Sequence, residues 1–440
     1  MFAYAEIHYR PRFMSSLIYM KKPEIVCDTP TRIDSGRPLP LFIMIKDADR
    51  YPVQLETVVV HTIYEDGVER VARFPYYGLS VSSPMWWDSI NIVPEFAGIV
   101  KVIPYVFVKK EGKVIPVCVD NYPGSSHSPL IINVSKSPLP GGDGWFHGDI
   151  HCHSYYTSDQ IEFGAPLEVL ALAGCSMGLH WIAVTDHSYD LDDFEDDYFS
   201  VDPLVIKWHN MRHMANLLEN SFTIIPGEEV TCRTENGRNC HMLALNTTRF
   251  IKGSGDSGEN GLNTVTERSI GEAVALCLKW GGIPCAAHPM ERITLLEKLL
   301  LKRSEWYPSD LKTPGILALQ IHNGARDRGF YKGKKTWINM ILNGYRMYAF
   351  GGSDAHGDLN LHRSVGLPFF SVKEGLHHTF GSVKTIVRAK SKEKEDILEG
   401  LKAGRAVVTE GPFIDLTVTS GYSVVGPGEI APRGSLTVRT

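Results

Sequence analysis

Residues 146–153 have the sequence Phe-His-Gly-Asp-Ile-His-Cys-His, which is typical of a strand that ends in two histidines separated by one residue. Side chains alternate along a strand with a period of two, so His151 and His153 point the same way. Such a pair can hold one cation. This strand therefore marks the start of the segment in which we expect the chemistry.

Strand-like and helix-like segments alternate from this strand onward. We expect strands at 146–151, 181–185, 223–226, 241–245, 283–287, 316–321 and 345–351. We expect helices at 166–177, 204–220, 267–280, 295–302 and 334–342. The alternation predicts an α/β fold of βα units around a parallel sheet, closed or nearly closed as a barrel.

The chain on either side of this region has a different pattern. Short β-rich runs at 41–45, 57–64, 99–108, 114–119 and 130–134 predict an antiparallel, immunoglobulin-like β-sandwich over residues 1–138. A Pro- and Gly-rich linker follows at 139–145, and the barrel is expected at 146–410. Residues 411–440 read as a last β segment, which could return to the sandwich.

Composition excludes several classes of protein. With 440 residues, 43% hydrophobic and 22% charged, the chain is neither disordered nor of low complexity. The net charge of −5 provides no overall basic field for a nucleic-acid backbone. No apolar run approaches the ~18 residues of a spanning helix, and no signal sequence is recognisable, so we expect a soluble, cytoplasmic protein with no membrane partner.

Potential metal ligands recur where the barrel strands end. They are His151 and His153 with Asp159, then Asp186-His187, Glu228-Glu229, His241, His288, His322-Asn323, Asp354 and His356. The C-terminal ends of parallel barrel strands converge on one face, so these groups should meet there. Each motif alone is weak, but the recurrence of imidazoles and carboxylates favours a metal site over a purely structural cluster.

The ordered series of motifs resembles the polymerase and histidinol phosphatase (PHP) superfamily of metal-dependent phosphoesterases. The motifs are His151-Cys-His153, Asp159, Thr-Asp-His187, Pro-Gly-Glu-Glu229, His241, Ala-His288-Pro and Ser-Asp354-Ala-His356. The resemblance covers about residues 145–410. The chain also resembles the subgroup that joins an N-terminal β-sandwich to this barrel, which includes a carbaryl-type carbamate-ester hydrolase.

The resemblance implies a distorted (β/α)7 barrel with two or three divalent ions in a cleft. It implies a first site of His151, His153, Glu229 and Asp354. A second site would use Asp159, His187 and His356, and a third Glu229, His241 and His288. Glu229, Asp354 and His356 would be the catalytic members, and Glu229 would bridge two metals. Glu229 is preferred to Glu228 because the family pattern is Gly-x-Glu and Gly227 sets that frame.

Two positions depart from the family pattern. Gln160 follows Asp159 where relatives usually have Gly, which puts the local turn in question. Cys240 precedes His241 where Gly is common, and we read it as a small buried thiol.

Mixed imidazole and carboxylate donors suit zinc, manganese or iron. Three divalent ions would outweigh the charges of Asp159, Glu229 and Asp354, so the pocket would attract a multiply charged anion. We therefore expect hydrolysis of a phosphate mono- or diester by a metal-bridged hydroxide, with a nucleotide, a sugar phosphate or an oligonucleotide end as substrate. A carboxyl or carbamate ester hydrolase with the same metals, and a non-catalytic binding protein, stay open.

Arg326 and Arg363 follow barrel strands and could pair with phosphate oxygens, although surface salt bridges account for them equally well. A nucleophile elbow, a His-Glu-x-x-His helix and a phosphate-binding P-loop are all missing from the sequence, which disfavours other hydrolase and nucleotide-binding mechanisms. The oligomeric state is left open.

Overall fold

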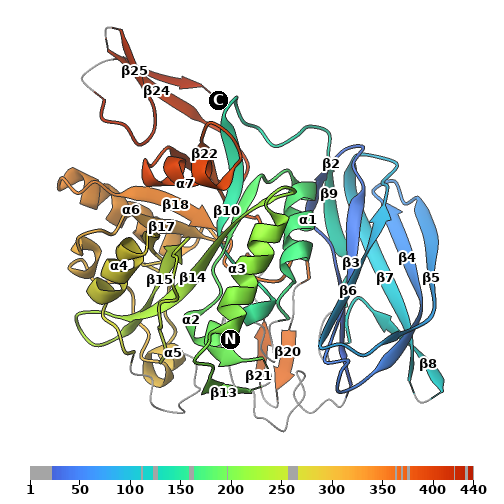
Figure 1. The fold of residues 1–440 in the computed structure, drawn as a ribbon. Coiled ribbons are helices and arrows are strands. Elements are labelled where there is room, and N and C mark those ends of the chain that lie inside the picture. Colours follow the sequence, from blue (N-terminus) through green and yellow to red (C-terminus); the bar gives the residue numbers. More distant parts are fainter. Residues whose placement is uncertain are drawn as a thin grey trace.

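The computed structural model describes most of the chain. The described residues are 22–110, 112–121, 127–157, 163–195, 197–255, 266–361, 364–367, 370–373, 377–420, 422–431 and 435–439. In Figure 1 the N-terminal strands lie beside a larger part in which helices surround a sheet.

Two sheets make up the N-terminal part. One contains β1 (Glu24–Asp28), β3 (Leu39–Lys46) and β6 (Met85–Ile92). The other has the order β2 (Arg32–Asp34), β9 (Leu130–Ser135), β7 (Gly98–Lys110), β4 (Val53–Tyr64) and β5 (Glu69–Val81), with β8 (Lys113–Cys118) paired to β7. Buried residues alternate along β4 and β7, and side chains from both sheets share one hydrophobic core. The assignment of an immunoglobulin-like sandwich to residues 1–138 stays a prediction.

A mixed, nearly closed sheet forms the second part. Its order is β18 (Tyr348–Gly352), β17 (Ala318–Asn323), β16 (Ile283–Ala286), β15 (Asn239–Leu245), β14 (Thr223–Arg233), β11 (Trp181–Val184), β10 (Trp145–His153), β22 (Lys384–Arg388) and β23 (Ala406–Thr409), and β19 (Ala355–His356) pairs with β10. β18, at one end of this order, also contacts β10, β22 and β23 at the other end. The sheet therefore curls back on itself, which brings the ends of distant strands together.

The parallel sheet expected from the sequence is wrong in two regions, because β22 pairs antiparallel with β10 and β23, and β15 pairs antiparallel with both of its neighbours. β14 and β15 form an antiparallel hairpin, in which Glu229 lies opposite Leu243 and Thr231 opposite His241. β15 also pairs antiparallel with β16. The reason is the short turn between Arg233 and Asn239, which is too short for the crossover that a parallel neighbour needs.

The helices are α1 (Leu167–Met177), α2 (Ser188–Leu191), α3 (Ile206–Leu218), α4 (Ile270–Lys279), α5 (Leu295–Leu300), α6 (Arg328–Leu342) and α7 (Lys394–Lys402), with short 3-10 turns at Tyr155–Thr157 and Asp310–Lys312. Caps explain several of their ends. Ser269 forms a capping box with Glu272, so α4 begins three residues later than expected. Asp327 accepts a hydrogen bond from the backbone of Phe330, so α6 begins six residues earlier than expected.

The remaining strands lie outside the two main parts. β12 (Asp193–Phe194) pairs with β13 (Asp197–Val201), and β20 (Ser364–Leu367) pairs with β21 (Phe370–Lys373). At the C-terminal end, β24 (Asp415–Ser420), β25 (Ser423–Val425) and β26 (Ser435–Arg439) form a sheet of their own. Among the described residues these last strands make no pairing with the N-terminal sheets, to which they could have returned.

Candidate metal centre

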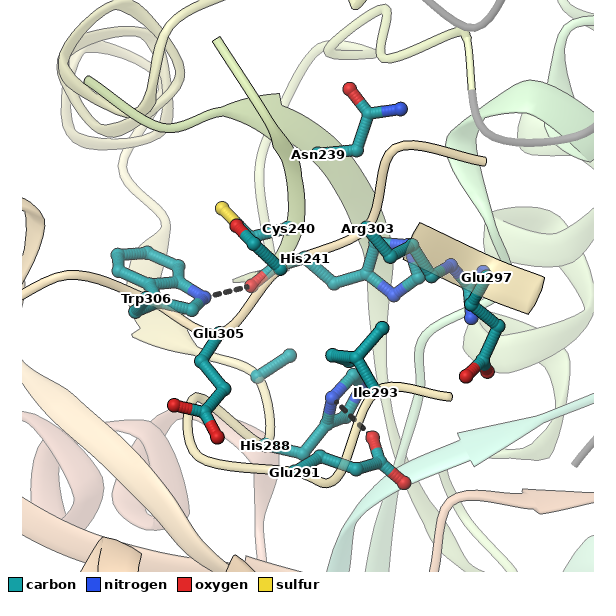
Figure 2. Close-up of a pocket in the computed structure, with 12 residues that line it drawn as sticks. Asn239, Cys240, His241, His288, Glu291, Ile293, Glu297, Arg303, Glu305 and Trp306 are labelled. Carbon is teal, nitrogen blue, oxygen red and sulfur yellow. Dashed lines mark hydrogen bonds and ion pairs between the residues drawn. The ribbon is translucent and has the colours of Figure 1, made fainter. Parts of the chain in front are cut away.

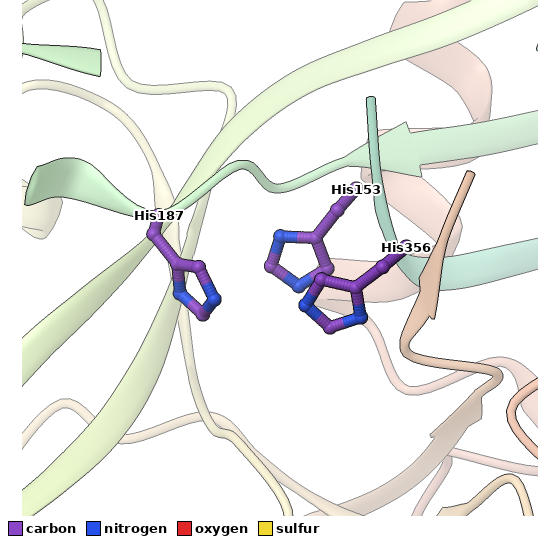
Figure 3. A group of neighbouring side chains, drawn as sticks. All are labelled: His153, His187 and His356. Atoms are coloured by element: carbon purple, nitrogen blue, oxygen red, sulfur yellow. The ribbon is translucent and has the colours of Figure 1, made fainter. Parts of the chain in front are cut away.

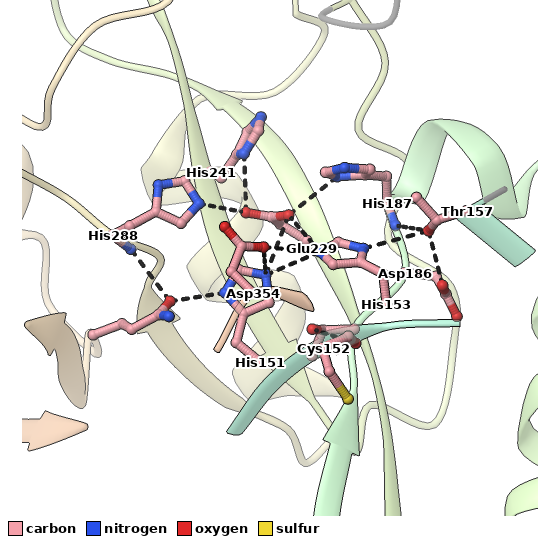
Figure 4. Close-up of polar contacts among 12 residues, drawn as sticks. His151, Cys152, His153, Thr157, Asp186, His187, Glu229, His241, His288 and Asp354 are labelled. Atoms are coloured by element: carbon pink, nitrogen blue, oxygen red, sulfur yellow. Dashed lines mark hydrogen bonds and ion pairs between the residues drawn. The ribbon is translucent and has the colours of Figure 1, made fainter. Parts of the chain in front are cut away.

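Four buried side chains converge at the end of β10. His151 and His153 come from β10, Glu229 from β14 and Asp354 from the segment after β18, and none is more than 1% exposed (Figure 4). His151 Nε2 lies 3.1 Å from His153 Nε2. Each of these nitrogens lies 3.2 Å from Asp354 Oδ1 and 3.4 Å from Glu229 Oε2.

These separations have the size expected for ligands around one ion. Protein nitrogen and oxygen atoms bind zinc at about 2.0–2.2 Å, so the atoms at two corners of a tetrahedron lie roughly 3.3–3.6 Å apart. An octahedral site places neighbouring ligands roughly 3 Å apart at the same bond lengths. The measured range of 3.1–3.4 Å falls in this window. The four side chains therefore fit a divalent cation.

The hydrogen bonds behind the imidazoles orient their lone pairs toward this point. The Thr157 hydroxyl donates to Asp186 Oδ1 and its oxygen accepts from the backbone N–H of His187, so the contact of 3.4 Å with His153 Nδ1 needs a proton on that nitrogen. His288 Nδ1 donates to Glu291 Oε2 at 2.8 Å. In both neutral rings Nε2 then carries the lone pair that a metal needs.

Glu229 divides its two oxygens between two groups of histidines. Oε2 faces His151, His153 and also His187, whose Nδ1 lies 3.1 Å away. Oε1 lies 2.9 Å from both His241 Nδ1 and His288 Nε2. Such a division suits a carboxylate that bridges two cations. His187 and His241, which face different oxygens of Glu229, also lie close enough to each other and to Glu229 to share one ion.

A third group consists of imidazoles alone. His153, His187 and His356 lie close together, and the rings of His153 and His356 stack with their centroids 4.0 Å apart (Figure 3). His356 Nδ1 lies 3.1 Å from the carbonyl oxygen of Asp354, an obligate acceptor, so this nitrogen also carries the proton. Three imidazoles in this arrangement suit a cation, which would bind their neutral forms.

Interactions between the histidines and carboxylates of the cluster shift the pKa values of His153, Glu229 and Asp354. Burial disfavours the charged form of His153, but its hydrogen bonds to Asp354 and Glu229 raise its pKa to about 9. Burial also opposes ionisation of Glu229 and Asp354, yet the neighbouring histidines hold both pKa values well below the ordinary range. The carboxylates are therefore ionised and demand positive charge from protons or metal ions.

The backbone around the ligands adopts strained conformations at two residues and is held by hydrogen bonds to Asp149. Asp354 has φ 55° and His288 has φ 24°, in the region that non-glycine residues rarely adopt. Asp149, which the sequence did not single out, accepts hydrogen bonds from the backbone of His151 and Ser353 and so ties β10 to the segment that carries Asp354. Its position two residues before the His-x-His pair was the only sequence signal.

The remaining residues named from the sequence are not among these groups of described ligands. Asp159 and Arg363 fall outside the described residues. Glu228 turns away from the histidines and accepts hydrogen bonds from Ile251 N, Thr247 Oγ1 and Ser188 Oγ. Arg326 is 57% exposed at its side chain and forms an ion pair of 2.7 Å with Glu410.

A small pocket opens beside the cluster (Figure 2). His241 and His288 form its inner wall, and Glu291, Arg303 and Trp306 line it further out. The indole of Trp306 donates to the carbonyl of His241, which holds one wall in place. A second pocket shares His288 and Glu291 with the first. Of the candidate ligands, His241 therefore lines the first pocket and His288 lines both.

Comparisons with known proteins give remote likenesses only. No family model matches the sequence, and no curated protein matches it. A two-domain protein of Bacteroides vulgatus containing a predicted PHP-like metal-dependent phosphoesterase is similar over 69% of this chain and 88% of its own, with 14% identity and a TM-score of 0.39. The CARDB domain of a Pyrococcus furiosus protein in complex with di-metal ions matches 26% of this chain and 94% of its own, with 13% identity and a TM-score of 0.17. Similarity at this level decides neither fold nor activity.

Among the described residues, no helix is both long and apolar enough to cross a membrane.

Proposed function

We propose that this chain is a metal-dependent phosphoesterase of the PHP superfamily, of the subgroup with an N-terminal β-sandwich. The observation that carries the proposal is the meeting of His151, His153, Glu229 and Asp354 at separations suited to one cation. The proposed centre has Glu229 as the bridge, with His241 and His288 on one side and His153, His187 and His356 on the other. Asp159 stays part of the proposal on the strength of its motif.

Zinc, manganese or iron would suit these donors, and two or three bound ions would lower the pKa of a water and stabilise charge on the substrate. The chain's own part is to orient the ligands, because Thr157 and Glu291 hold two imidazoles in the required tautomer. Glu229, Asp354 and His356 are the proposed catalytic members.

Phosphate is favoured over a neutral ester by charge. Asp159, Glu229 and Asp354 would supply three negative charges, which two or three divalent ions exceed, so the filled site would attract an anion. Arg326 and Arg363 stay candidates for substrate contact, although a phosphate would have to compete with Glu410 for Arg326. The proposed substrate is a phosphate mono- or diester of a small molecule or of an oligonucleotide end, and the proposed location is the cytoplasm.

The test combines metal analysis with a substrate panel. Protein purified without chelator should contain two or three equivalents of zinc, manganese or iron and release phosphate from phosphomonoesters or dinucleotides. His151→Ala and His153→Ala should each lose metal and activity together. Cleavage of carboxyl or carbamate esters alone would replace the phosphoesterase by the other hydrolase, and activity that survives both substitutions would refute the metal mechanism.

A further inference from the structure

Two uncharged amide side chains on β17 connect the candidate ligands from behind. Gln320 Oε1 lies 2.8 Å from His151 Nδ1 and accepts the backbone N–H of His288 at 3.3 Å. Gln320 Nε2 donates to Asn323 Oδ1 at 2.8 Å, and Asn323 Nδ2 donates to Asp354 Oδ2 at 3.0 Å. The sequence did not single out Gln320, and no motif pointed to it.

The direction of each hydrogen bond in the series from Asp354 through Asn323 and Gln320 to His151 can be assigned from the Asp354 carboxylate. The Asp354 carboxylate can only accept, so Asn323 must present its NH2 group there and its oxygen to Gln320. Gln320 must then donate to Asn323 and turn its own oxygen toward His151 and the N–H of His288. An amide oxygen only accepts, so His151 Nδ1 carries a proton and the neutral ring presents its Nε2 lone pair to Asp354 and Glu229.

We propose that Gln320 and Asn323 are a positioning pair that fixes the tautomer of His151 and the carboxylate orientation of Asp354. This inference rests on the proposed function for its metal consequences. Gln320 also holds the backbone of His288, which faces the other oxygen of Glu229, so one side chain serves both sides of the proposed bridge.

Burial makes Gln320 hard to replace. Gln320 is 1% exposed, and His151 and Asp354 are no more exposed, so water does not substitute for a lost partner. Removal of such supporting groups typically weakens metal binding by about 10- to 100-fold. We expect a loss of this size from Gln320→Met, which keeps the shape of the side chain but removes every hydrogen bond.

The experiment uses the full chain with zinc or manganese ions as the probe. Gln320→Met is compared with Gln320→Glu, which retains an acceptor for His151 and for the backbone of His288. Asn121→Leu is the control, because it removes two amide hydrogen bonds in the N-terminal part, to Ile25 and Pro23. The dissociation constant is measured by competition with a chelating indicator, and thermal unfolding reports general damage.

A second readout is independent of metal. Nitrogen NMR of the metal-free protein, at alkaline pH where imidazoles are neutral, should show His151 with its proton on Nδ1 in the wild type and in Gln320→Glu. Gln320→Met should lose this preference and bind metal 10- to 100-fold more weakly, while Asn121→Leu changes neither property. A proton on Nε2 in the wild type, or wild-type affinity in Gln320→Met, would overturn the proposal. A wild type that binds no metal would refute the proposed function, whereas the tautomer would still test the pair.

Discussion

Glu229→Gln should be the most damaging single substitution at the candidate centre. The carboxylate is fully buried and reaches five imidazole nitrogens within 2.9–3.4 Å, those of His151, His153, His187, His241 and His288. The amide of this variant would carry no negative charge, and its NH2 group would face the histidines that now contact one of the two Glu229 oxygens. Breaking a buried charge pair costs about 3–5 kcal/mol, and each 1.4 kcal/mol is tenfold in affinity, so metal binding should weaken by roughly 100- to 4,000-fold.

The neighbouring residue supplies a matched control. Glu228 is equally buried but faces the opposite way, toward Ile251 N and Ser188 Oγ. Burial raises the pKa of Glu228 well above its ordinary value, which favours the neutral form that Gln imitates. Glu228→Gln should therefore leave metal affinity close to that of the wild type.

The assay for both variants is metal competition titration, followed by phosphate release at saturating metal. Similar losses of metal affinity in the two variants would show that disturbance of β14 weakens binding, whichever way the substituted carboxylate points. A severe loss in Glu228→Gln alone would refute the assignment of Glu229 as the bridge.

Three further outcomes are expected. Chelation should lower the melting temperature and added zinc or manganese should restore it, because a ligand at 100 times its Kd adds about 2.7 kcal/mol to the free energy of unfolding; an unchanged melting curve would contradict a buried metal centre. Burial, assisted by the charges of His180 and Lys384, lowers the pKa of His147 to about 4, so the unfolded chain takes up the extra proton as pH falls. Stability should drop by about 3 kcal/mol between pH 6.5 and pH 4, and denaturant titrations should show a shallower decline in His147→Gln. Gly148→Ala would place a methyl group 2.1 Å from the buried ring of Trp181 and should cost about 1–3 kcal/mol, whereas Gly271→Ala in α4 meets no neighbour and should gain up to about 1 kcal/mol by the same measurement.

Local patterns predicted most secondary structure after residue 145, because helix and strand periodicities are properties of neighbouring residues. The β22 strand (Lys384–Arg388) was missed, as were β1, β2, β5 and β6 in the N-terminal part. β5 exposes most of its residues, so the alternation that identifies a half-buried strand is weak there. Orientation failed at the hairpin of β14 and β15, since the helical crossover expected between parallel strands is missing there.

The candidate ligands were predictable for a different reason. Imidazoles and carboxylates at the ends of successive strands must meet once those strands share a sheet, so the chemical types and their order sufficed to name His151, His153 and Asp354. Gln320 and Asp149 left no such signal, because the role of a glutamine or an aspartate inside a strand depends on its hydrogen-bond partners, which the sequence does not give.

The sequence by itself determined most of the helices and strands after residue 145 and named most of the side chains that the structure gathers at the candidate centre, because both depend on residue type and spacing along the chain. Only the tertiary structure decided which histidines face each oxygen of Glu229, that Glu228 points away from those histidines, and that Arg326 pairs with Glu410. These features depend on the direction of single side chains and on partners many residues away, and that information appears only when the sheet has closed on itself.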